Sequence, residues 1–289
     1  MQLGFVGAGL MGHGMAKSLL AAGHDLTVLA HRNRAPVDDL VQRGATEARS
    51  LQCLARQAVD VVFLCLPNSD VVQSVVEQLV PDLRAGAIIV DSTTSHPLRT
   101  RQLHGQLAER SIDLVDAPIT GGPKHAENAQ LTALVGADDA VFTVIEPLLH
   151  TFASTVLHMG GPAAGHTAKL LNNAITNTTS ALLAEVYSVA REHGVDWRKL
   201  HQAMMGGAAN SGTLAKMVAP ALDGDFGGHA FALANAEKDA RYYCTFRESN
   251  GEASLIMRAV QATLAGYCAR GLGDKHFSEL LDVNTLKAL

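Results

Sequence analysis

Short apolar runs alternate with helical patterns over the first 160 residues, and this alternation restricts the fold more than any other feature. Most of the runs are apolar almost without interruption, as expected for strands that helices cover on both faces. Helical patterns such as 10–23 and 69–80 separate them, and Pro81 is a plausible stop for the second. The alternation predicts βαβ units and a doubly wound parallel sheet. The expected strands are LGFVG (3–7), LTVLA (26–30), VDVVFLCL (59–66), AIIVD (87–91), IDLVDAP (112–118), LTALVG (131–136) and STVLHM (154–159).

The pattern changes after GGPAAG (160–165). From about residue 163 there is no convincing strand pattern, and long helical patterns are broken by glycines. A chain of 289 residues has room for about two domains of ordinary size. We therefore expect an α/β domain over 1–160 and an all-helical domain over 161–289. The expected helices of the second domain are 164–193, 196–206, 211–222, 230–249 and 252–270.

The segment Gly7-Ala8-Gly9-Leu10-Met11-Gly12 has the pattern GxGxxG directly after the first expected strand. In this context Gly7 permits a tight turn, Gly9 lets a pyrophosphate approach the backbone, and Gly12 lets the helix pack closely on the strand. The N–H groups at the helix start, near Leu10 and Met11, would face the phosphates. The motif predicts that 1–160 is a Rossmann domain that binds a dinucleotide. The alternative is a glycine-rich turn with no ligand.

The residues after the second expected strand bear on which dinucleotide binds. An NAD site commonly has an acidic residue there, which holds the ribose 2′-hydroxyl. Here LTVLA is followed by His31-Arg32-Asn33-Arg34, so the acid is missing. An arginine at this place suits a 2′-phosphate, which favours NADP over NAD, with Arg32 and Asn33 as candidate contacts. The alternative is that the arginines are solvated loop charges.

A second glycine motif, DAPITGG (116–122), follows the apolar run IDLV. Backbone N–H groups at Gly121 and Gly122 can bind an anion such as a substrate carboxylate, and Thr120 can add a hydroxyl donor. The alternative is a plain turn.

The stretch GHTAKLLNN (165–173) places Lys169 and Asn173 one helical turn apart. The face that they share carries amides and hydroxyls with a single charge, whereas ordinary solvated faces are rich in Glu, Lys and Arg. We interpret it as a face that lines a polar cleft, with a largely apolar stripe opposite. The alternative is that Lys169 is an ordinary surface lysine. The polar face holds Lys169, Asn172, Asn173, Thr176, Asn177 and Ser180; the apolar stripe holds Leu171, Ala174, Ile175, Thr178 and Leu182.

Composition excludes several classes of function. The net charge of −5 and the lack of a Lys/Arg block argue against nucleic acid and anionic membranes as partners. The histidines are scattered without HExxH, and the cysteines form no cluster at ligand spacing, so we expect no metal site. The four cysteines lie far apart without CxxC, which suits a reducing compartment. With no signal-peptide pattern and no apolar run of about 18 residues, we expect a cytoplasmic protein.

Taken together, the motifs resemble the β-hydroxyacid dehydrogenases, the family of 3-hydroxyisobutyrate dehydrogenase and tartronate semialdehyde reductase. The resemblance covers essentially the whole chain, and several spaced motifs in the right order are more specific than any one of them. It is carried by GAGLMGHGMA (7–16), CLPNSDVV (65–72), DSTTSHP (91–97), DAPITGGPKHAENAQLTALVGAD (116–138), GHTAKLLNN (165–173) and Lys238-Asp239.

The resemblance implies roles for individual residues. Lys169 corresponds to the catalytic lysine of the family, and Asn173 to the amide that positions the reacting group. Thr120-Gly121-Gly122 corresponds to the loop that grips the substrate carboxylate, although the family more often has serine at position 120. Leu66, Pro67, Thr94 and Lys238 lie where the family contacts the cofactor.

Two departures from the family pattern leave the substrate open. After Lys238-Asp239 this chain has Ala240-Arg241-Tyr242-Tyr243 in place of the usual aliphatic residues, and the insert Pro123-Lys124-His125 is not universal. The resemblance also implies a homodimer or homotetramer, since members associate through the helical half.

The expected activity is hydride transfer between NAD(P) and a small carboxylate-bearing β-hydroxy acid or semialdehyde. Lys169 would protonate the alkoxide in reduction and remove the hydroxyl proton in oxidation. Two alternatives stay open. One is an imine reductase-like NADPH enzyme, which would normally have another residue at position 169. The other is a non-catalytic dinucleotide-binding sensor or scaffold, which would not need this lysine.

Overall fold

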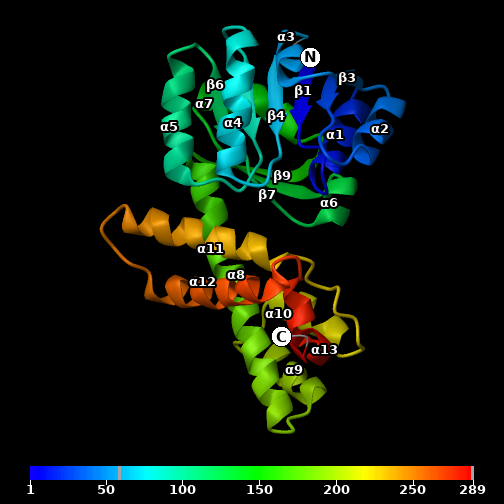
Figure 1. Ribbon diagram of the computed structural model, residues 1–289, viewed down its shortest axis with the longest axis vertical. Helices are drawn as coiled ribbons and strands as arrows, with labels where there is room; N and C mark the ends of the chain where they lie inside the picture. The colour runs from blue at the N-terminus through cyan, green and yellow to red at the C-terminus, as the bar shows by residue number, and fades with distance from the viewer. Residues whose placement is uncertain (58–59, 288–289) are drawn as a thin grey trace. The chain divides into compact units, whose positions relative to one another are not determined.

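The computed structural model describes residues 1–57 and 60–287. The chain separates into two compact units, Met1–Lys169 and Leu170–Leu289. Figure 1 shows strands and helices in the first unit and helices in the second. The α/β fold with a following helical domain is thus confirmed.

The first unit contains one mixed sheet in its described residues. Its strands run β3-β2-β1-β4-β5-β6-β8-β7, with β9 also paired to β8. The order 3-2-1-4-5-6 of the first six is that of a dinucleotide-binding sheet. The strands are β1 (Gln2–Val6), β2 (Asp25–Leu29), β3 (Thr46–Ala48), β4 (Val61–Leu64), β5 (Ile88–Asp91), β6 (Asp113–Asp116), β7 (Ile119–Thr120), β8 (Leu131–Gly136) and β9 (Ala153–Gly160).

The strands β1 to β6 all pair in parallel, as the sequence predicts. The far edge differs from a purely parallel sheet: β8 is antiparallel to β6 and to β7, and β9 is parallel to β8. The reversal follows from a short connection, because the chain turns back through β7 and α6 instead of making a helical crossover. Residue 59, where the expected strand 59–66 begins, lies outside the described residues, and β4 covers Val61–Leu64.

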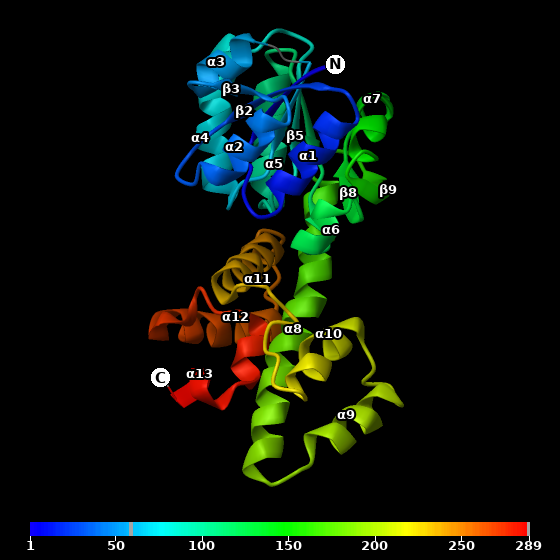
Figure 2. The ribbon, with the colours of Figure 1, turned by 90° about the vertical axis from the view of Figure 1, so that its right-hand side faces the viewer.

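Helices cover both faces of this sheet because successive strand residues point to opposite faces. In β4, Val61 and Phe63 belong to the core shared with α1 and α7, whereas Val62 and Leu64 belong to the core shared with α4 and α5. This is the doubly wound arrangement (Figures 1 and 2). The helices are α1 (Gly12–Ala21), α2 (Ala35–Gln42), α3 (Leu51–Arg56), α4 (Ser69–Leu79), the 3-10 turn η1 (Val80–Asp82), α5 (Pro97–Ala108), α6 (Pro123–Glu127) and α7 (Asp139–Leu149).

The second unit is helical in its described residues, apart from one antiparallel bridge between Ala232 and His276. Tyr187 and Phe277 are the largest fully buried side chains of its core. In Figures 1 and 2, α11 and α12 lie side by side. The helices are α8 (Ala164–Glu192), which begins in the first unit, α9 (Trp197–Met205), α10 (Gly212–Ala221), α11 (Leu233–Glu248), α12 (Leu255–Tyr267), η2 (Cys268–Leu272), η3 (Phe277–Leu281) and α13 (Val283–Lys287).

The two faces of α8 are exposed in the opposite sense to an ordinary amphipathic helix. Asn173, Asn177 and Ser180 on the polar face are buried, at 6%, 1% and 0% exposure. Asn177 Nδ2 donates to the carbonyl of Ala236 in α11 at 3.5 Å. The expectation that the whole polar face lines a cleft is therefore wrong, because these amides and hydroxyls are hydrogen-bonded inside the helical unit. Of the apolar stripe, Leu171, Ile175 and Leu182 are exposed, at 53%, 72% and 56%, whereas Ala174 and Thr178 are half-buried. Val189, further along α8, is also exposed, at 47%.

Candidate active site

The glycine loop between β1 and α1 has a geometry that only glycines fit at two positions. Gly7 has φ +101°, and a Cβ there would lie 2.2 Å from the carbonyl oxygen of Cys65. A Cβ at Gly12 would lie 2.1 Å from the oxygen of Gly7. A Cβ at Gly9 would meet nothing within 4 Å among the described residues, so the backbone there is open to a ligand.

The start of α1 is open in the same way. Its N-cap, Met11, makes no side-chain capping hydrogen bond, whereas Asn68 caps α4 and Ser50 caps α3. The side chain of Leu10 is 76% exposed. Uncapped first-turn N–H groups and the positive end of the helix dipole suit a phosphate. The open backbone at Gly9 and this helix start are the features that fit a bound dinucleotide.

The two arginines in the segment after β2 differ in their ion pairs. Arg34 is bound by acidic side chains: NH1 and NH2 lie 3.0 Å from the two oxygens of Glu47, and NH2 also lies 3.0 Å from Asp38. Asn33 Oδ1 accepts the N–H of Ala35. Arg32 is exposed and forms no ion pair within residues 1–57 and 60–287. Of the two arginines, Arg32 is therefore the one whose charge is not already compensated.

The loops that follow β4 and β5 are joined by a hydrogen bond. The N–H of Leu66 donates to Thr93 Oγ1 at 3.0 Å, and the N–H of Thr93 donates to the buried carboxylate of Asp91 at 2.9 Å. Leu66 also contacts Gly7, since its Cδ2 would lie 3.2 Å from a Cβ at that glycine. Burial raises the pKa of the neighbouring Cys65 thiol to about 12, with a smaller contribution from Asp91. That thiol stays protonated and unreactive.

The remaining cofactor candidates on these loops differ in exposure. Pro67 is exposed and Thr94 is half-buried. The loops thus bring Leu66 and Thr94 to the carboxyl end of the sheet beside the glycine loop, which is where ligands bind in open α/β sheets.

The Thr120–Gly122 loop begins in β7 and leads into α6. Thr120 pairs with Thr132 of β8, and Gly121 has φ +122°, a conformation that favours glycine. The N–H of Gly122 donates to His125 Nδ1 at 3.2 Å. The backbone thus turns sharply at Gly121, and one of the two glycine N–H groups of the loop contacts a side chain of the insert.

Lys169 is half-buried on α8 and is the last residue of the first unit. The start of its helix is held by Asp116, at the end of β6: Asp116 Oδ1 accepts the N–H of Ala163, and Oδ2 accepts the N–H of His166, both at 2.7 Å. Burial raises the pKa of the Asp116 carboxyl above its ordinary value, and His166 and these N–H groups oppose the rise. Asp116 and His166 are absent from the sequence-based candidates, because their contact joins residues 50 positions apart.

Asn173 and Lys238 are brought together in the second unit by Asp239. Asn173 Nδ2 donates to Asp239 Oδ2 at 2.7 Å. Lys238 Nζ forms an ion pair with Asp239 Oδ1 at 3.3 Å and lies 5.6 Å from the ring centre of Tyr242. The ion pair does not have the geometry of a hydrogen bond. The carboxylate of Asp239 is 2% exposed. Asp239 of the Lys238-Asp239 pair thus holds the side-chain amide of Asn173 in place.

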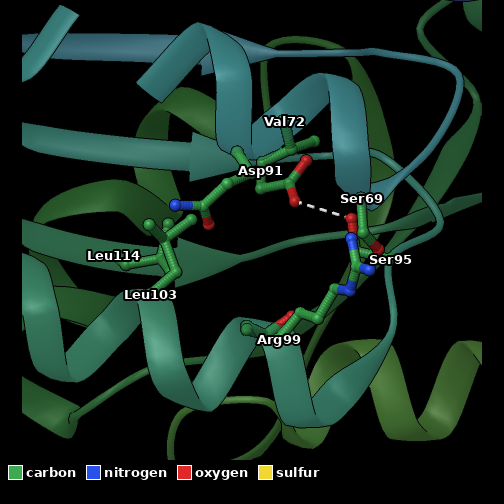
Figure 3. Close-up of a pocket in the computed structure, with 9 residues that line it drawn as sticks. Ser69, Val72, Asp91, Ser95, Arg99, Leu103 and Leu114 are labelled. Carbon is green, nitrogen blue, oxygen red and sulfur yellow. Dashed lines mark hydrogen bonds between the residues drawn. The ribbon is translucent and has the colours of Figure 1, made fainter. Parts of the chain in front are cut away.

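A small pocket at the end of β5 lies between α4 and α5 (Figure 3). Asp91 accepts the hydroxyl of Ser95 at 2.9 Å within it, and Arg99 at its rim pairs with Asp70. None of the predicted cofactor or substrate residues lies on its described lining. The candidate site residues therefore do not line this pocket, although Asp91 and Thr100 on its lining contact Thr93 and His166.

Two structural features are absent from residues 1–57 and 60–287. These residues contain no group of three or more His, Cys, Asp or Glu side chains placed to hold a metal ion. They also contain no helix with the length and apolar character that a bilayer span requires.

Comparison with known families identifies both halves of the chain. Residues 2–161 match the family model described as the NAD-binding domain of 6-phosphogluconate dehydrogenase. Residues 163–284 match the model described as NAD-binding of NADP-dependent 3-hydroxyisobutyrate dehydrogenase.

Known relatives agree with these matches over most of their length. The 2-(hydroxymethyl)glutarate dehydrogenase of Eubacterium barkeri is 33% identical over 98% of this chain and 94% of its own. The 2-hydroxy-3-oxopropionate reductase of Escherichia coli (strain K12) is 33% identical over 73% of this chain and 72% of its own. The solved 3-hydroxyisobutyrate dehydrogenase of Mycobacterium tuberculosis, with L-serine, has the same fold, with a TM-score of 0.88 at 24% identity over 99% of both chains. The chain therefore belongs to the β-hydroxyacid dehydrogenase family of NAD(P)-dependent oxidoreductases.

Proposed function

We infer that this enzyme transfers hydride between NAD(P) and a small β-hydroxy acid or semialdehyde, and we propose that Lys169 is its general acid and base. The observation that carries the proposal is the placement of Lys169 on α8, half-buried, one turn from Asn173. When bound, the nicotinamide supplies or accepts the hydride.

The residues of the chain then supply position and proton. In reduction Lys169 Nζ donates a proton to the oxygen that gains negative charge; in oxidation the neutral amine removes the hydroxyl proton. Thr120, Gly121 and Gly122 bind the substrate carboxylate, and Asn173 orients the reacting group or the lysine. Binding by backbone N–H groups would require His125 to release the N–H of Gly122.

The test of the acid–base role compares three substitutions. Lys169→Ala should fold and bind cofactor, because all the proposed dinucleotide contacts except Lys238 precede residue 160, but turnover should fall by at least ~10²-fold. Lys169→Arg should fail nearly as badly, since a guanidinium keeps its proton near neutrality. Asn173→Ala should do intermediate damage, because the proton source remains. If Lys169 is an ordinary surface lysine, all three variants should have near-normal rates.

The control is Lys199→Ala, which removes an exposed lysine from α9 and should leave turnover unchanged. Circular dichroism and NADPH fluorescence establish folding and cofactor binding in each variant. Wild-type turnover in Lys169→Arg contradicts the acid–base role.

The substrate class is tested with a panel of semialdehydes and hydroxy acids. Each carboxylate-bearing compound is paired with its uncharged analogue, because the Thr120–Gly122 loop is proposed to bind a carboxylate. The panel includes 2-(hydroxymethyl)glutarate, for which the relative that covers 98% of the chain is named. Equal rates with and without the carboxylate would contradict the role of the loop.

We propose NADP as the favoured cofactor, with the 2′-phosphate held by Arg32. The missing acid after β2 and the uncompensated charge of Arg32 support this, and so does the description of the family model for 163–284 as NADP-dependent. Hydrogen bonds to charged groups contribute about 1.5–3 kcal/mol, so Arg32→Ala should weaken NADPH binding about tenfold or more and leave NADH binding nearly unchanged.

Arg34→Ala is the matched control, because Glu47 and Asp38 already bind that guanidinium. Fluorescence titration of both cofactors gives the dissociation constants. Equal NADPH and NADH affinities in the wild type contradict the preference.

We propose that residues 1–160 form the dinucleotide-binding domain and 161–289 the helical substrate and oligomerisation domain. The two family models meet between residues 161 and 163, and β9 ends at Gly160. The compact units divide slightly later, within α8. Residues 288–289 lie outside the described residues.

We also propose a homodimer or homotetramer in the cytoplasm. The exposed apolar stripe of α8 supports association of copies, and the free cysteines Cys53, Cys65, Cys244 and Cys268 suit a reducing compartment. A light-scattering mass near the monomer value of 30.5 kDa at working concentration contradicts the oligomer.

A further inference from the structure

The helix that carries Lys169 is fixed to the sheet by one buried carboxylate. Asp116 is fully buried, and each of its two oxygens accepts a backbone N–H at the start of α8, from Ala163 and from His166. A carboxylate is purely an acceptor when ionised, so it can satisfy both of these N–H groups at once. The contact replaces an ordinary side-chain cap with one that comes from the end of β6.

Two glycines make room for this contact. A Cβ at Gly136 would lie 2.5 Å from Asp116 Oδ1, and a Cβ at Gly165 would lie 2.3 Å from the carbonyl oxygen of Leu134. Both distances are shorter than side chains tolerate. Gly165, the glycine of GHTAKLLNN, is therefore needed for the close approach of α8 to β8 and Asp116.

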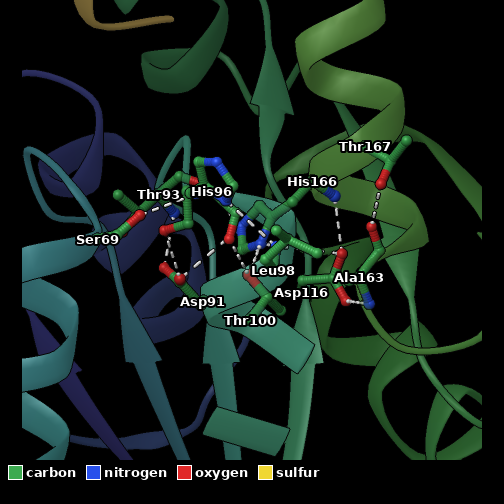
Figure 4. A network of polar contacts seen from close by, with 11 residues as sticks. Ser69, Asp91, Thr93, His96, Leu98, Thr100, Asp116, Ala163, His166 and Thr167 are labelled. Atoms are coloured by element: carbon green, nitrogen blue, oxygen red, sulfur yellow. Dashed lines mark hydrogen bonds and ion pairs between the residues drawn. The ribbon is translucent and has the colours of Figure 1, made fainter. Parts of the chain in front are cut away.

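His166 extends the contact to the loop after β5 (Figure 4). Its ring is fully buried, with Nε2 2.9 Å from the carbonyl oxygen of Thr93 and Nδ1 2.8 Å from Thr100 Oγ1. The carboxylates of Asp91 and Asp116 lie 3.7 Å and 4.0 Å from these nitrogens. Two buried carboxylates and two hydrogen-bond partners thus hold the His166 ring in a single orientation.

The same network reaches the loop after β4. Thr93, whose carbonyl contacts His166, accepts the N–H of Leu66 through its hydroxyl. Asp91 in turn accepts the N–H of Thr93 and the hydroxyl of Ser95. The cofactor loops at Leu66 and Thr93 and the start of α8 therefore share one buried frame of hydrogen bonds.

Lys169 lies three residues after His166, a rise of about 4.5 Å along the helix. Any shift of the first turn of α8 against the sheet moves the lysine with it. A displacement of about 1 Å in a reacting group can lower a rate by ~10²-fold.

We propose that Asp116 and His166 are positioning residues, which fix the start of α8 against the two cofactor loops and so set where Lys169 delivers its proton. This inference rests on the proposed acid–base role of Lys169. It assigns a function to two buried groups that do not themselves take part in the chemistry.

The first test uses near-isosteric substitutions. In Asp116→Asn the side-chain oxygen can accept one of the two N–H groups, but the NH₂ group faces the other, donor against donor. His166→Gln can still donate to the carbonyl of Thr93, whereas His166→Leu cannot. For Asp116→Asn and His166→Leu we expect kcat, per site that binds NADPH, to fall between about 10- and 100-fold, with His166→Gln much closer to wild type.

Titration of NADPH-binding sites removes unfolded molecules from this comparison, so a merely structural role leaves kcat per site unchanged. Ile145→Val, in the buried core of α7 and outside the network, is the control for lost stability: its melting temperature should fall while kcat per site stays the same. A kcat per site within twofold of wild type in Asp116→Asn overturns the proposal.

The second test is a double-mutant cycle with Lys169→Ala, measured by single turnover with enzyme in excess. If Asp116 acts through the lysine, Asp116→Asn has little further effect once the lysine is gone, within about threefold. An equal fold-loss in both backgrounds overturns the positioning role and leaves the acid–base role standing. Wild-type turnover in Lys169→Ala alone instead overturns the acid–base role.

Discussion

At the scale of single residues, the orientation of the Asn173 amide is set by a carboxylate. Asp239 is 3% exposed and can only accept, so the NH₂ group of Asn173 must face it, and Oδ1 points elsewhere and accepts from Asn172 at 3.1 Å. A free asparagine could present either end of its amide to a substrate. Asp239 of the Lys238-Asp239 pair therefore fixes which end of the Asn173 amide faces it.

Asp239→Asn should lower turnover by about 10-fold or more, less than the loss expected for Lys169→Ala. The reason is that a hydrogen bond to a charged acceptor contributes about 1.5–3 kcal/mol. An amide at position 239 also allows the Asn173 side-chain amide to flip, which exchanges its oxygen and its NH₂ group. The measurement is kcat at saturating cofactor and substrate. Glu237→Gln, two residues before Asp239 on α11 and paired with the exposed Arg241, is the control and should stay within about twofold, because the amide oxygen can still accept from Gln261 and a pair with an exposed arginine contributes little. Equal effects of the two substitutions would remove the special role of Asp239.

At the scale of elements, α1 and α6 touch at a glycine. A Cβ at Gly14 would lie 2.6 Å from the backbone carbon of Ala126 and 2.8 Å from the nitrogen of Glu127. Polar contacts of α1 flank this glycine: His13 contacts the carboxylates of Asp39 and Glu127, and Lys17 forms an ion pair with Glu127. Through α6, the helix of the dinucleotide motif supports the Thr120–Gly122 loop.

Gly14→Ala should destabilise the protein by about 1–3 kcal/mol, because backbone atoms of α6 must move away. It should also raise the KM for the carboxylate substrate more than the Kd for cofactor, since the displaced loop is the one before α6. Gly105→Ala is a matched control in α5, where a Cβ meets nothing within 4 Å among the described residues. It should stabilise by about 0.5–1 kcal/mol. Urea denaturation measures both, and the same sign for both would contradict the packing argument.

Elements with a strong local pattern were predictable from the sequence, and those fixed by distant contacts were not. The expected helix 164–193 is α8 within one residue at its end, because its period extends over many turns. The strands β3 and β7 have three and two residues and show no pattern of their own. The reversal of β8 follows from the short connection through β7 and α6, and these two short elements have no pattern by which the sequence would reveal them.

The site shows the same division. The glycines of the dinucleotide motif and the GHTAKLLNN stretch are contiguous in the chain, so residue types and spacing were enough to single them out. The Asp116–His166 contact, the pairing of Arg34 with Glu47, and the burial of Asn177 all join segments separated by other elements. Only the fold brings such pairs together, which is why Arg32 and Arg34 could not be told apart from the sequence.

At the scale of the whole molecule, the exposed stripe of α8 is the feature that a single copy leaves unexplained. Leu171, Ile175, Leu182 and Val189 follow one another at spacings of four, seven and seven residues, so they lie on one side of the helix. All are about half exposed or more, while Asn173, Asn177 and Ser180 on the polar side of the same helix are buried. A self-complementary stripe on a single helix suits a two-fold interface between copies.

Ile175→Glu should therefore reduce the molecular mass measured by light scattering toward the monomer value of 30.5 kDa. The side chain is 72% exposed, so the substitution has little effect on the folding of one copy, but a charge buried between two apolar stripes lacks a partner. Gln202→Glu adds the same charge to the exposed face of α9 and should leave the mass of the wild type unchanged. If Ile175→Glu keeps the wild-type mass, the stripe is not the interface. If both variants dissociate, net charge and not the stripe controls assembly.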